Sequence, residues 1–428
     1  MAKRVLVIGQ GGREHALVWK IAQSPQVEKI YAAPGNPGMV SIAECIDISV
    51  EDIDSLLKFA KSNAIDLTVV GPEVPLILGI VDEFRKEGLK IFGPTKEAAQ
   101  LEGSKVFTKN LLKKYNIPTA DYQVFTDVAS ARNYIDNHMT DDKKLVIKAD
   151  GLAAGKGVVI AASKDEAHQV IDSMLLDKAF GDAGNKIVIE EFLEGEEVSV
   201  FAISDGRDYI TLISAQDHKR VFDNDEGPNT GGMGAYVNPP IYKDEKLQKE
   251  VESKILRPVV DAMRQEGYPF TGVLYAGLMI TALGPKVLEF NARFGDPETQ
   301  AVMPMIASDI VELFEKTCDG KLKDYQVELY DGSCVCVVLA SKGYPGNYEK
   351  GLPIEGLESV SDDTLIFHAG TAFKDGKLVT NGGRVLSVVC KGQNVKEAID
   401  KVYAQINLVK FDGMHYRRDI GRRAVREV

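Results

Sequence analysis

The amino-acid sequence predicts a multidomain protein of mixed α/β and α+β structure. Short apolar strands alternate with helical patterns over residues 1–103, which is typical of a doubly wound parallel sheet. Over residues 122–192 a glycine-rich loop joins two apolar strands, which indicates a small α+β unit. Residues 330–428 carry mainly strand patterns. We therefore expect four domains, divided as 1–103, 104–121 plus 193–329, 122–192 and 330–428.

Composition and charge limit the kind of protein this can be. A hydrophobic content of 44% and a charged content of 27% are ordinary for a globular protein. The formal net charge of −12 argues against nucleic-acid or membrane-surface binding, so anionic ligands need local positive sites. Five cysteines without C-x-x-C spacing favour a reducing compartment. No signal-peptide pattern opens the chain and no apolar run approaches ~18 residues, so we expect a cytoplasmic location.

The first strand, at residues 4–8, leads into a glycine loop and a helix. Further strands are expected at 28–33, 67–71 and 89–92, and helices at 51–62 and 76–87. The loop is not a dinucleotide fingerprint, because Glu14 stands where its third glycine belongs and Ala33 replaces the ribose-binding acid. Two interpretations remain open. The backbone N–H groups of Gly11 and Gly12, with Arg13, bind one phosphate, or the glycines only allow tight packing.

A glycine-rich hairpin marks the middle of the chain. Strands are expected at 145–148 and 158–161, and the loop between them carries Lys156. The loop fails the P-loop pattern, because Gly157 replaces the Mg²⁺-binding Ser or Thr and because it joins two strands. With Lys148 on the first strand, the hairpin is typical of a lid that closes over phosphates. An exposed turn is the alternative.

A further signal points to an anion in this region. A helix is expected from Ser104 to about Tyr115, and its first turn carries Lys105. A lysine at that end opposes the helix dipole, which is easier to explain if Lys105 reaches an anion than if it is merely solvated. Capping patterns also predict helix starts at Ser163 and Asn394.

Residues 286–300 carry the most unusual polar pattern. If 286–293 is a strand, Val287 shares a face with Glu289, Asn291 and Arg293, because side chains alternate with a period of two. Two oxygen ligands beside a fixed cation suit a hard metal that holds phosphate, with Arg293 gripping a second anion. An edge strand with one solvated face is the alternative.

Glycine-rich loops precede and follow this stretch. Asp205-Gly206 predicts a hairpin, and the glycines of 227–236 indicate a flexible loop or close approach to a ligand. Strands are expected at 272–282, 332–340, 364–373 and 384–390. The loops at 368–371 and 381–384 are either ordinary turns or face the site. We assign no role to His415.

In this order, the pieces resemble the ATP-grasp superfamily: the N-terminal sheet, the lid with Lys148, the Glu190–Leu193 hinge, and the pair Glu289 and Asn291. More narrowly, the chain resembles the glycinamide ribonucleotide synthetase family over nearly its whole length. The most specific motif is the signature 293–300, Arg-Phe-Gly-Asp-Pro-Glu-Thr-Gln. The segments 11–16, 216–220 and 227–236 support it independently.

The resemblance implies a Rossmann-like pre-ATP-grasp domain, an ATP-grasp core with a lid, and a C-terminal β-rich domain. It also implies a ligase that joins glycine to 5-phosphoribosylamine in purine biosynthesis, using ATP with Mg²⁺ or Mn²⁺, and we expect a monomer. The roles it implies, by residue, are ATP binding by Lys105, Lys148, Lys156, Glu190, Glu191, Phe192, Leu193 and Glu197; metal binding by Glu289 and Asn291; substrate binding by Gly11, Gly12, Arg13, Asp217, Lys219, Arg293 and Asp296; and catalysis by Arg293 and Lys148.

One departure from the wider superfamily leaves the number of metal ions open. Many members carry a further acid on the strand before the metal pair, and residues 272–282 contain none. Two other functions stay open: another ATP-grasp enzyme, such as a carboxylase acting on a purine intermediate, and a non-catalytic nucleotide sensor. Another ATP-grasp enzyme would lack the 293–300 signature. A sensor could lose the metal pair, whereas this chain has both Glu289 and Asn291.

Overall fold

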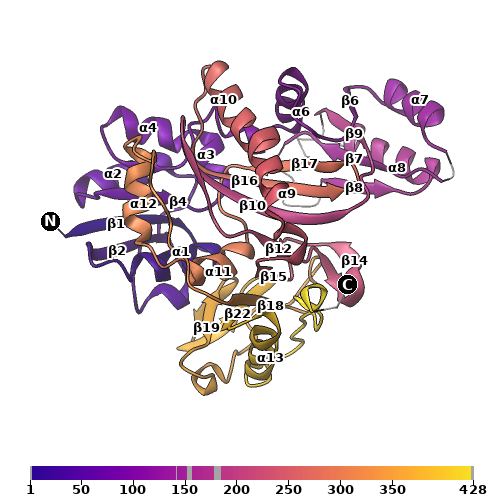
Figure 1. The fold of residues 1–428 in the computed structure, drawn as a ribbon. Helices are drawn as coiled ribbons and strands as arrows, with labels where there is room; N and C mark the ends of the chain where they lie inside the picture. The colour runs from indigo at the N-terminus through magenta and orange to yellow at the C-terminus, as the bar shows by residue number, and fades with distance from the viewer. Residues whose placement is uncertain (1, 141, 152–156, 178–184, 426–428) are drawn as a thin grey trace.

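The computed structural model describes residues 2–140, 142–151, 157–177 and 185–425 (Figure 1). Its described strands form sheets of five, nine and four strands and two small hairpins. None of the helices in this part of the chain is long and apolar enough to cross a membrane.

The N-terminal sheet is wholly parallel, as predicted, with strand order β3-β2-β1-β4-β5. Its strands are β1 Lys3–Gly9, β2 Val27–Pro34, β3 Glu44–Cys45, β4 Leu67–Val70 and β5 Ile91–Phe92. Its helices are α1 Gly12–Ile21, α2 Ile53–Ser62, α3 Glu73–Leu78 and α4 Ile80–Lys86. The single helix predicted at 76–87 is wrong. Gly79, with φ of +95°, ends α3 in the left-handed conformation that glycine adopts readily, and α4 starts anew.

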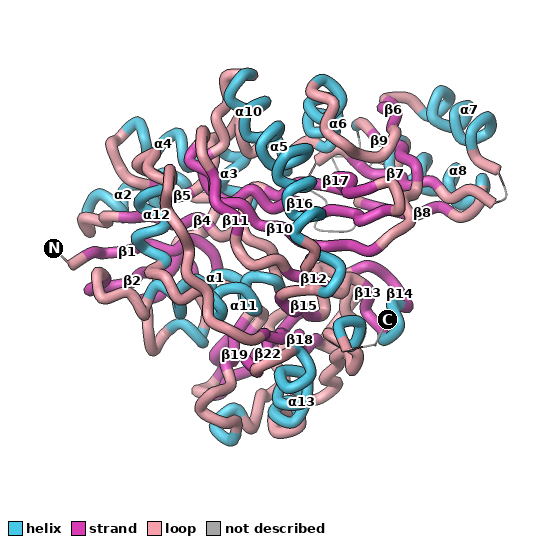
Figure 2. Tube along the Cα trace, viewed as in Figure 1, coloured by secondary structure: helices cyan, strands magenta, loops and turns pink. Residues whose placement is uncertain are grey.

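The four-stranded lid sheet confirms the predicted hairpin strands. Its strands, in the order β6-β9-β7-β8, are β6 Tyr122–Phe125, β9 Ile187–Glu191, β7 Leu145–Ala149 and β8 Val158–Ala161. The helices α7 Val128–His138 and α8 Lys164–Leu175 cover it at the end of the molecule remote from the N-terminal sheet (Figure 2). Ser163 caps α8 by accepting a hydrogen bond from the Glu166 N–H, as the sequence predicts.

The largest sheet runs through both the central and the C-terminal parts of the chain. Its path is β17-β16-β10-β12-β15-β18-β22-β19, with β11 paired to β10. The strands are β10 Glu196–Asp205, β11 Tyr209–Thr211, β12 Ala215–Asp217, β15 Gly234–Val237, β16 Thr271–Thr281, β17 Gly284–Asn291, β18 Ser333–Ala340, β19 Leu365–His368 and β22 Arg384–Gly392. Because β15 pairs with β18, the C-terminal strands extend the central sheet.

Shorter elements complete the chain. The hairpins are β13 Arg220–Phe222 with β14 Glu226–Asn229, and β20 Thr371–Lys374 with β21 Lys377–Thr380. The remaining helices are α5 Gln100–Gly103, α6 Lys105–Lys114, α9 Glu245–Val251, α10 Arg257–Gln265, α11 Glu298–Val302, α12 Ile310–Cys318 and α13 Val395–Ile406, with a π-helical turn at Glu252–Leu256.

The single strand predicted at 364–373 is wrong, because it divides into β19 and β20 in different sheets. The chain turns at Gly370, whose N–H bonds to the Arg384 carbonyl. A Cβ on Gly370 would lie 2.5 Å from the Cα of Gly382, so only glycine permits this approach of two backbones.

A β-bulge in β17 corrects the predicted alternation of residues 287–293. Gly277 of β16 pairs with Glu289 and Leu278 pairs with Val287, so Leu288 is the extra residue. Val287 therefore lies in the same apolar core as Phe290, on the face opposite that predicted. Glu289 and Asn291 still share the face that looks into the cavity described below.

The N-terminal and central sheets share their apolar cores. One core joins Leu6 and Phe84 to Val200 and Phe290. A second joins residues of α1, such as Leu17, to strands β10, β16 and β18. The C-terminal helix α13 packs on β18 and β22 in a third core. Shared cores resist independent motion, because separating the sheets would expose apolar surface to water.

A histidine contact joins the N-terminal helix to the C-terminal strands. His15 of α1 accepts at Nδ1 a hydrogen bond of 2.8 Å from the His368 N–H at the end of β19. Asn36 donates to the His368 carbonyl at 2.8 Å. Burial lowers the pKa of His15 to about 3 and that of His368 to about 4. Both imidazoles are therefore neutral at pH 7.

We expect low pH to weaken the contact between His15 and His368. Because the folded-state pKa of His15 lies below the unfolded value of about 6.5, the unfolded chain binds the proton first, and stability falls as pH falls. Between pH 6.5 and 4.5, His15 should account for about 2–3 kcal/mol of lost unfolding free energy. His15→Asn, which does not titrate, should lose less than wild type by that amount in urea titrations at the two pH values. Equal losses would contradict the assignment.

Candidate active site

A cavity of about 1710 Å³ lies where the N-terminal, lid, central and C-terminal parts meet. Of the residues predicted to bind ligand or metal, it is lined by Arg13, Lys105, Lys148, Glu190, Glu191, Phe192, Leu193, Glu197, Asp217, Lys219, Glu289, Asn291, Arg293 and Asp296. Gly11 and Gly12 are not among its lining residues. Lys156 lies outside the described residues.

A buried carboxylate holds two lysines at the lid end of the cavity. Glu190 Oε2 lies 3.0 Å from Nζ of both Lys109 and Lys148, and all three residues are buried. Burial lowers the pKa of Lys109 to about 8, although Glu190 opposes that shift. Among the described residues, Glu190 Oε1 is buried without a hydrogen-bond partner. Because such an atom is costly to bury, it suits a donor supplied by a ligand.

The bulge in β17 gives Lys148 a further anchor. Its Nζ donates to the carbonyl of Leu288 at 3.1 Å. Leu288 is the residue that has no ladder partner in β16, so a strand irregularity supplies the acceptor. Lys148 is thereby fixed over the strand that carries Glu289 and Asn291.

The first turn of α6 meets the start of the glycine hairpin. Lys105 Nζ donates to the Gly151 carbonyl at 3.1 Å. Asp150 Oδ1 accepts hydrogen bonds from Ser104 Oγ at 3.0 Å and from the Val106 N–H at 3.1 Å. The Asp150 carboxylate thus offsets the unfavourable position of Lys105 at the helix N-terminus. Burial lowers the pKa of Lys105.

The hinge after β9 provides an apolar slot beside these charges. Leu193 packs with Ala120, Met279 and Leu288 on the cavity side of the sheet. Glu191, in contrast, is engaged outward, because its Oε1 accepts hydrogen bonds from Lys286 Nζ and the Asp121 N–H. At the far end of the hinge, Glu197 Oε2 lies 2.6 Å from Lys219 Nζ. A flat apolar slot with polar ends is typical of a site for a nucleobase and its ribose.

Glu289 and Asn291 fit a hard divalent metal. Burial raises the pKa of Glu289, but Lys219, Lys148 and Lys105 outweigh it and keep that pKa below its ordinary value. The carboxylate is therefore ionised, as a metal ligand must be. Within the described residues, no group of three or more His, Cys, Asp or Glu side chains could hold a metal. A pair of oxygen ligands such as Glu289 and Asn291 suits Mg²⁺, because this ion keeps several waters and takes substrate phosphate oxygens as its other ligands.

Arg293 is held by two carboxylates from the N-terminal side. Its Nη2 lies 2.9 Å from Glu102 Oε1 and its Nε lies 3.3 Å from Glu73 Oε2. Its Nη1 donates to the Phe294 carbonyl at 3.1 Å, and its Nη2 also reaches Asn291 Oδ1 at 3.4 Å. A guanidinium has five N–H groups, so these contacts leave one for a ligand.

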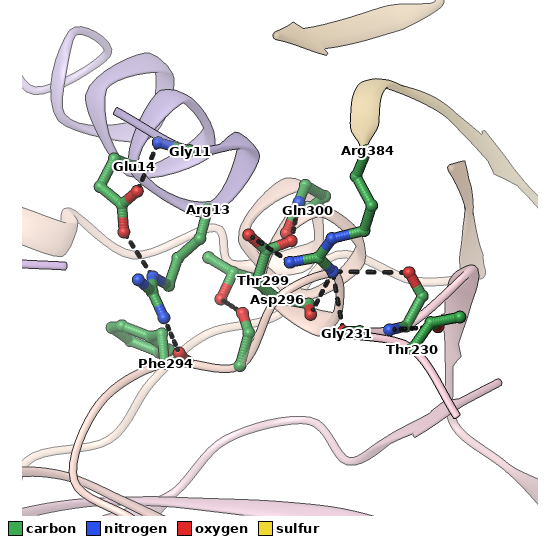
Figure 3. A network of polar contacts seen from close by, with 12 residues as sticks. Gly11, Arg13, Glu14, Thr230, Gly231, Phe294, Asp296, Thr299, Gln300 and Arg384 are labelled. Atoms are coloured by element: carbon green, nitrogen blue, oxygen red, sulfur yellow. Dashed lines mark hydrogen bonds and ion pairs between the residues drawn. The ribbon is translucent and has the colours of Figure 1, made fainter. Parts of the chain in front are cut away.

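The signature loop lies between two more arginines, one from each flanking part (Figure 3). Arg13 of α1 donates to the Phe294 carbonyl at 3.2 Å. Arg384 of β22 donates to the Asp296 carbonyl at 2.7 Å and to the Gly231 carbonyl at 2.8 Å, and its Nη2 lies 3.3 Å from Asp296 Oδ2. Asp296, predicted to bind substrate, is therefore already partnered within the protein.

The glycine loop before α1 is occupied by the chain itself. Glu14 Oε2 accepts a hydrogen bond of 2.6 Å from the Gly11 N–H, and Glu14 also pairs with Arg13. A Cβ on Gly12 would lie 2.6 Å from Gln300 Nε2, so this glycine serves close packing. The structure favours packing over phosphate binding for Gly11 and Gly12, while Arg13 reaches the cavity.

A group of acids surrounds Lys219 on the inner wall. Glu298, buried at the start of α11, accepts hydrogen bonds from Tyr275 Oη at 3.0 Å and from Ser199 Oγ at 3.2 Å. Burial raises the pKa of Asp217, with Lys219 opposing and Glu298 adding to the shift. Carboxylates on this wall suit a cationic group such as a protonated amine.

Several of the residues that build this cavity are not predicted from the sequence. They are Glu73, Glu102, Lys109, Tyr275, Glu298 and Arg384, and all of them line it. Glu298 lies within the signature 293–300 and Arg384 at the end of the loop 381–384, so these two carry a signal in the sequence. Nothing in the local pattern around Lys109 distinguishes it from a solvated helix lysine.

Comparison with known proteins identifies the family. The phosphoribosylglycinamide synthetase models match in three parts: the N domain at residues 3–102, the ATP-grasp (A) domain at 103–299 and the C domain at 334–423. A curated relative, the phosphoribosylamine–glycine ligase of Halalkalibacterium halodurans, is 54% identical, over 99% of this chain and 97% of its own. The chain therefore belongs to the phosphoribosylglycinamide synthetase family.

Solved structures support the same fold. The crystal structure of phosphoribosylamine–glycine ligase from Thermotoga maritima matches with a TM-score of 0.85 and 38% identity, covering 97% of this chain and all of that chain (100%). The biotin carboxylase domain of 2-oxoglutarate carboxylase from Hydrogenobacter thermophilus matches with a TM-score of 0.74 at 16% identity, covering 97% and 91%. This second likeness shows the fold alone. The predicted ATP-grasp fold is confirmed.

We expect the side chain of Glu190 to contribute more to the free energy of unfolding than that of Glu191. Glu190→Gln removes the only carboxylate that contacts both Lys109 and Lys148 in the described structure, and should lower the unfolding free energy by about 3 kcal/mol. Glu191→Gln breaks only the partly exposed pair with Lys286 and should cost less than about 1 kcal/mol. Urea denaturation of both variants tests this. Similar losses would show that the buried cluster is not the stronger interaction.

Proposed function

We propose that the protein joins glycine to 5-phosphoribosylamine to give glycinamide ribonucleotide, ADP and phosphate, in de novo purine biosynthesis. The observation that carries this proposal is full-length family membership together with one cavity that collects Lys148, Glu289, Asn291 and Arg293. A sensor would not need the metal pair beside two phosphate-facing lysines, and the signature 293–300 distinguishes the chain from a carboxylase.

ATP lies at the lid end of the cavity in this proposal. The adenine enters the apolar slot beside Leu193, and its amino group donates to the free Oε1 of Glu190. Glu197 holds the ribose, and Lys105 and Lys148 contact the phosphates. Lys156, predicted for the same task, lies outside the described residues. Phosphoryl transfer needs mainly positioning and neutralisation of charge, which these lysines supply.

The proposed metal is Mg²⁺ or Mn²⁺, held by Glu289 and Asn291. When bound, it would neutralise charge on the β- and γ-phosphates and orient them for transfer. Three lysines near this site keep the Glu289 carboxylate ionised. Lys148 and Lys105 lie on the nucleotide side, and Lys219 lies on the wall that carries Asp217 and Glu298.

Glycine binds between Arg293 and the wall that carries Asp217 and Glu298. Its carboxylate takes the remaining N–H of Arg293, and its ammonium faces Asp217 and Glu298. A glycine carboxylate oxygen attacks the γ-phosphorus, and the bond to the ADP oxygen breaks, which gives glycyl phosphate and ADP. The developing charge lies beside Arg293, whose pKa is raised by Glu102 and Glu73 despite burial.

The second step forms the amide. The amine nitrogen of 5-phosphoribosylamine attacks the carbonyl carbon of glycyl phosphate, the C–O bond to phosphate breaks, and the nitrogen loses a proton. Because the intermediate is prone to hydrolysis, the cavity must exclude water while both steps proceed. In this proposal the lid carries out that exclusion, because Lys148 of β7 and Val158 of β8 line the cavity.

We also propose that the protein works in the cytoplasm as a monomer. Its five cysteines are all free, which fits a reducing compartment. The described cavity is built from residues of one chain, so the proposed reaction needs no second copy.

A substrate-omission assay tests the function. ADP release is measured with ATP, glycine and 5-phosphoribosylamine together, and then with each left out in turn. ADP formation should require glycine, and amide product should require all three. ADP formation that ignores glycine would overturn the proposal.

Arg293→Ala should lower kcat/KM for glycine by more than ~10²-fold, because a contact that strengthens in the transition state is worth about 3 kcal/mol. Steady-state kinetics with glycine varied measure this. Arg264→Ala, which removes an exposed arginine paired with Asp261 on α10, is the matched control and should leave the value unchanged. An unaltered glycine dependence in Arg293→Ala would remove Arg293 from this role.

A further inference from the structure

The C-terminal segment 415–423, which we call the C-terminal strap, is bonded to the loop 220–231 of the central part, which we call the wall loop. Arg417, 1% exposed, donates to the Arg220 carbonyl at 3.1 Å and lies 3.0 Å from Asp225 Oδ1. It also pairs with Asp419 at 2.7 Å. A buried guanidinium with three fixed partners sets the position of both segments.

Further contacts run the length of the strap. The Arg418 N–H donates to Asp223 at 2.7 Å, and the Asn224 N–H donates to Asp419 at 2.9 Å. His415 Nε2 bonds to the Val221 carbonyl at 2.8 Å, so this histidine has a structural partner that the sequence did not indicate. Asn224 has a φ of 59°, a left-handed conformation that non-glycine residues adopt at a cost. The strap holds it there.

The wall loop is part of the cavity. Arg220, Asp225, Asn229, Thr230 and Gly231 all line it, and Arg423 of the strap completes the same wall. Arg423 pairs with Asp225, the residue that Arg417 also holds. The loop follows Lys219 directly, and Thr230 donates to the Lys219 carbonyl at 2.8 Å through both its N–H and its hydroxyl. These two bonds tie the end of the wall loop to the residue that precedes its start.

This lobe of the cavity is basic. Its lining cations are Arg220, Lys350, Arg384 and Arg423, against the acids Asp225 and Asp296. Strands β13 and β14 of the wall loop lie beside the strap, and Arg417 of the strap bonds to Asp225 of the loop. A cavity of about 1710 Å³ exceeds what one small ligand needs, so a second ligand has room. Clustered arginines recognise phosphate groups through their charge and forked hydrogen bonds.

We propose that the wall loop and Arg423 bind the phosphate of the sugar-phosphate substrate, and that Arg417 is the positioning residue that holds this wall in place. The proposal rests on the ligase activity proposed above and names the site of its third substrate. This site takes the place of the phosphate site predicted at Gly11 and Gly12, which are not among the residues that line the cavity. The Gly11 N–H is bonded to Glu14, and Gly12 packs closely against Gln300.

The test compares Arg417→Met, Arg417→Lys and Arg423→Met with wild type. In Arg417→Met and Arg423→Met, KM for 5-phosphoribosylamine should rise about tenfold, while KM for ATP and for glycine stays within about twofold. Arg417→Lys keeps the charge but loses the forked geometry, so its KM should fall between. Lys401→Met, which removes an exposed lysine paired with Glu397 on α13, is the control and should match wild type.

A binding measurement makes the outcome independent of turnover. Ribose 5-phosphate, a stable probe with the same phosphate, should bind wild type by calorimetry and bind Arg423→Met about tenfold more weakly. Equal rises of all three KM values, or unaltered ribose 5-phosphate binding in Arg423→Met, would overturn the proposal. If Arg417→Met does not fold, Arg417→Lys and Arg423→Met decide it. Failure of the ligase proposal would instead appear in wild type, as ADP formation that ignores glycine.

Discussion

Arg293 is a partly buried cation, with its side chain 18% exposed, between Glu73 of α3 and Glu102 of α5, and much of the cavity depends on that arrangement. Arg293 follows strand β17, while its carboxylate partners come from α3 and α5, so the ion pairs fasten the end of that strand to the N-terminal part of the chain. An unpaired charge at this depth would be strongly unfavourable. Glu102 also accepts a hydrogen bond from the Ala292 N–H at 2.7 Å, which fixes the backbone just before the signature loop.

Charged and polar side chains on the cavity wall fall into three groups. Lys148 and Lys109 share Glu190 at the lid end, Glu289 and Asn291 lie on β17, and Arg384 and Arg423 come from the C-terminal part of the chain. A net charge of −12 on the whole chain would repel phosphates, so each positive group has to be local and partly buried. Fixed partners keep these groups oriented before any ligand binds, which is the condition for electrostatic stabilisation.

The family relation and the physical argument support each other at different levels. Identity of 54% with a curated ligase establishes the family, whereas the cavity explains how such a chain could perform the reaction. The biotin carboxylase likeness at 16% identity shows that the same fold serves other substrates. A fold by itself therefore does not fix the substrate, which depends on the residues that line the site.

The parallel N-terminal sheet, the strands of the lid hairpin and the helix caps could be predicted from the sequence, because each depends on a local period or a local turn. The sequence did not determine the bulge at Leu288, which moves Val287 into the core, or the engagement of Gly11 by Glu14. These depend on partners far along the chain, as do the Lys109–Glu190 pair and the grip of Arg417 on Asp225. Only the tertiary structure decides such pairs, because no local pattern records which distant charge a buried side chain will meet.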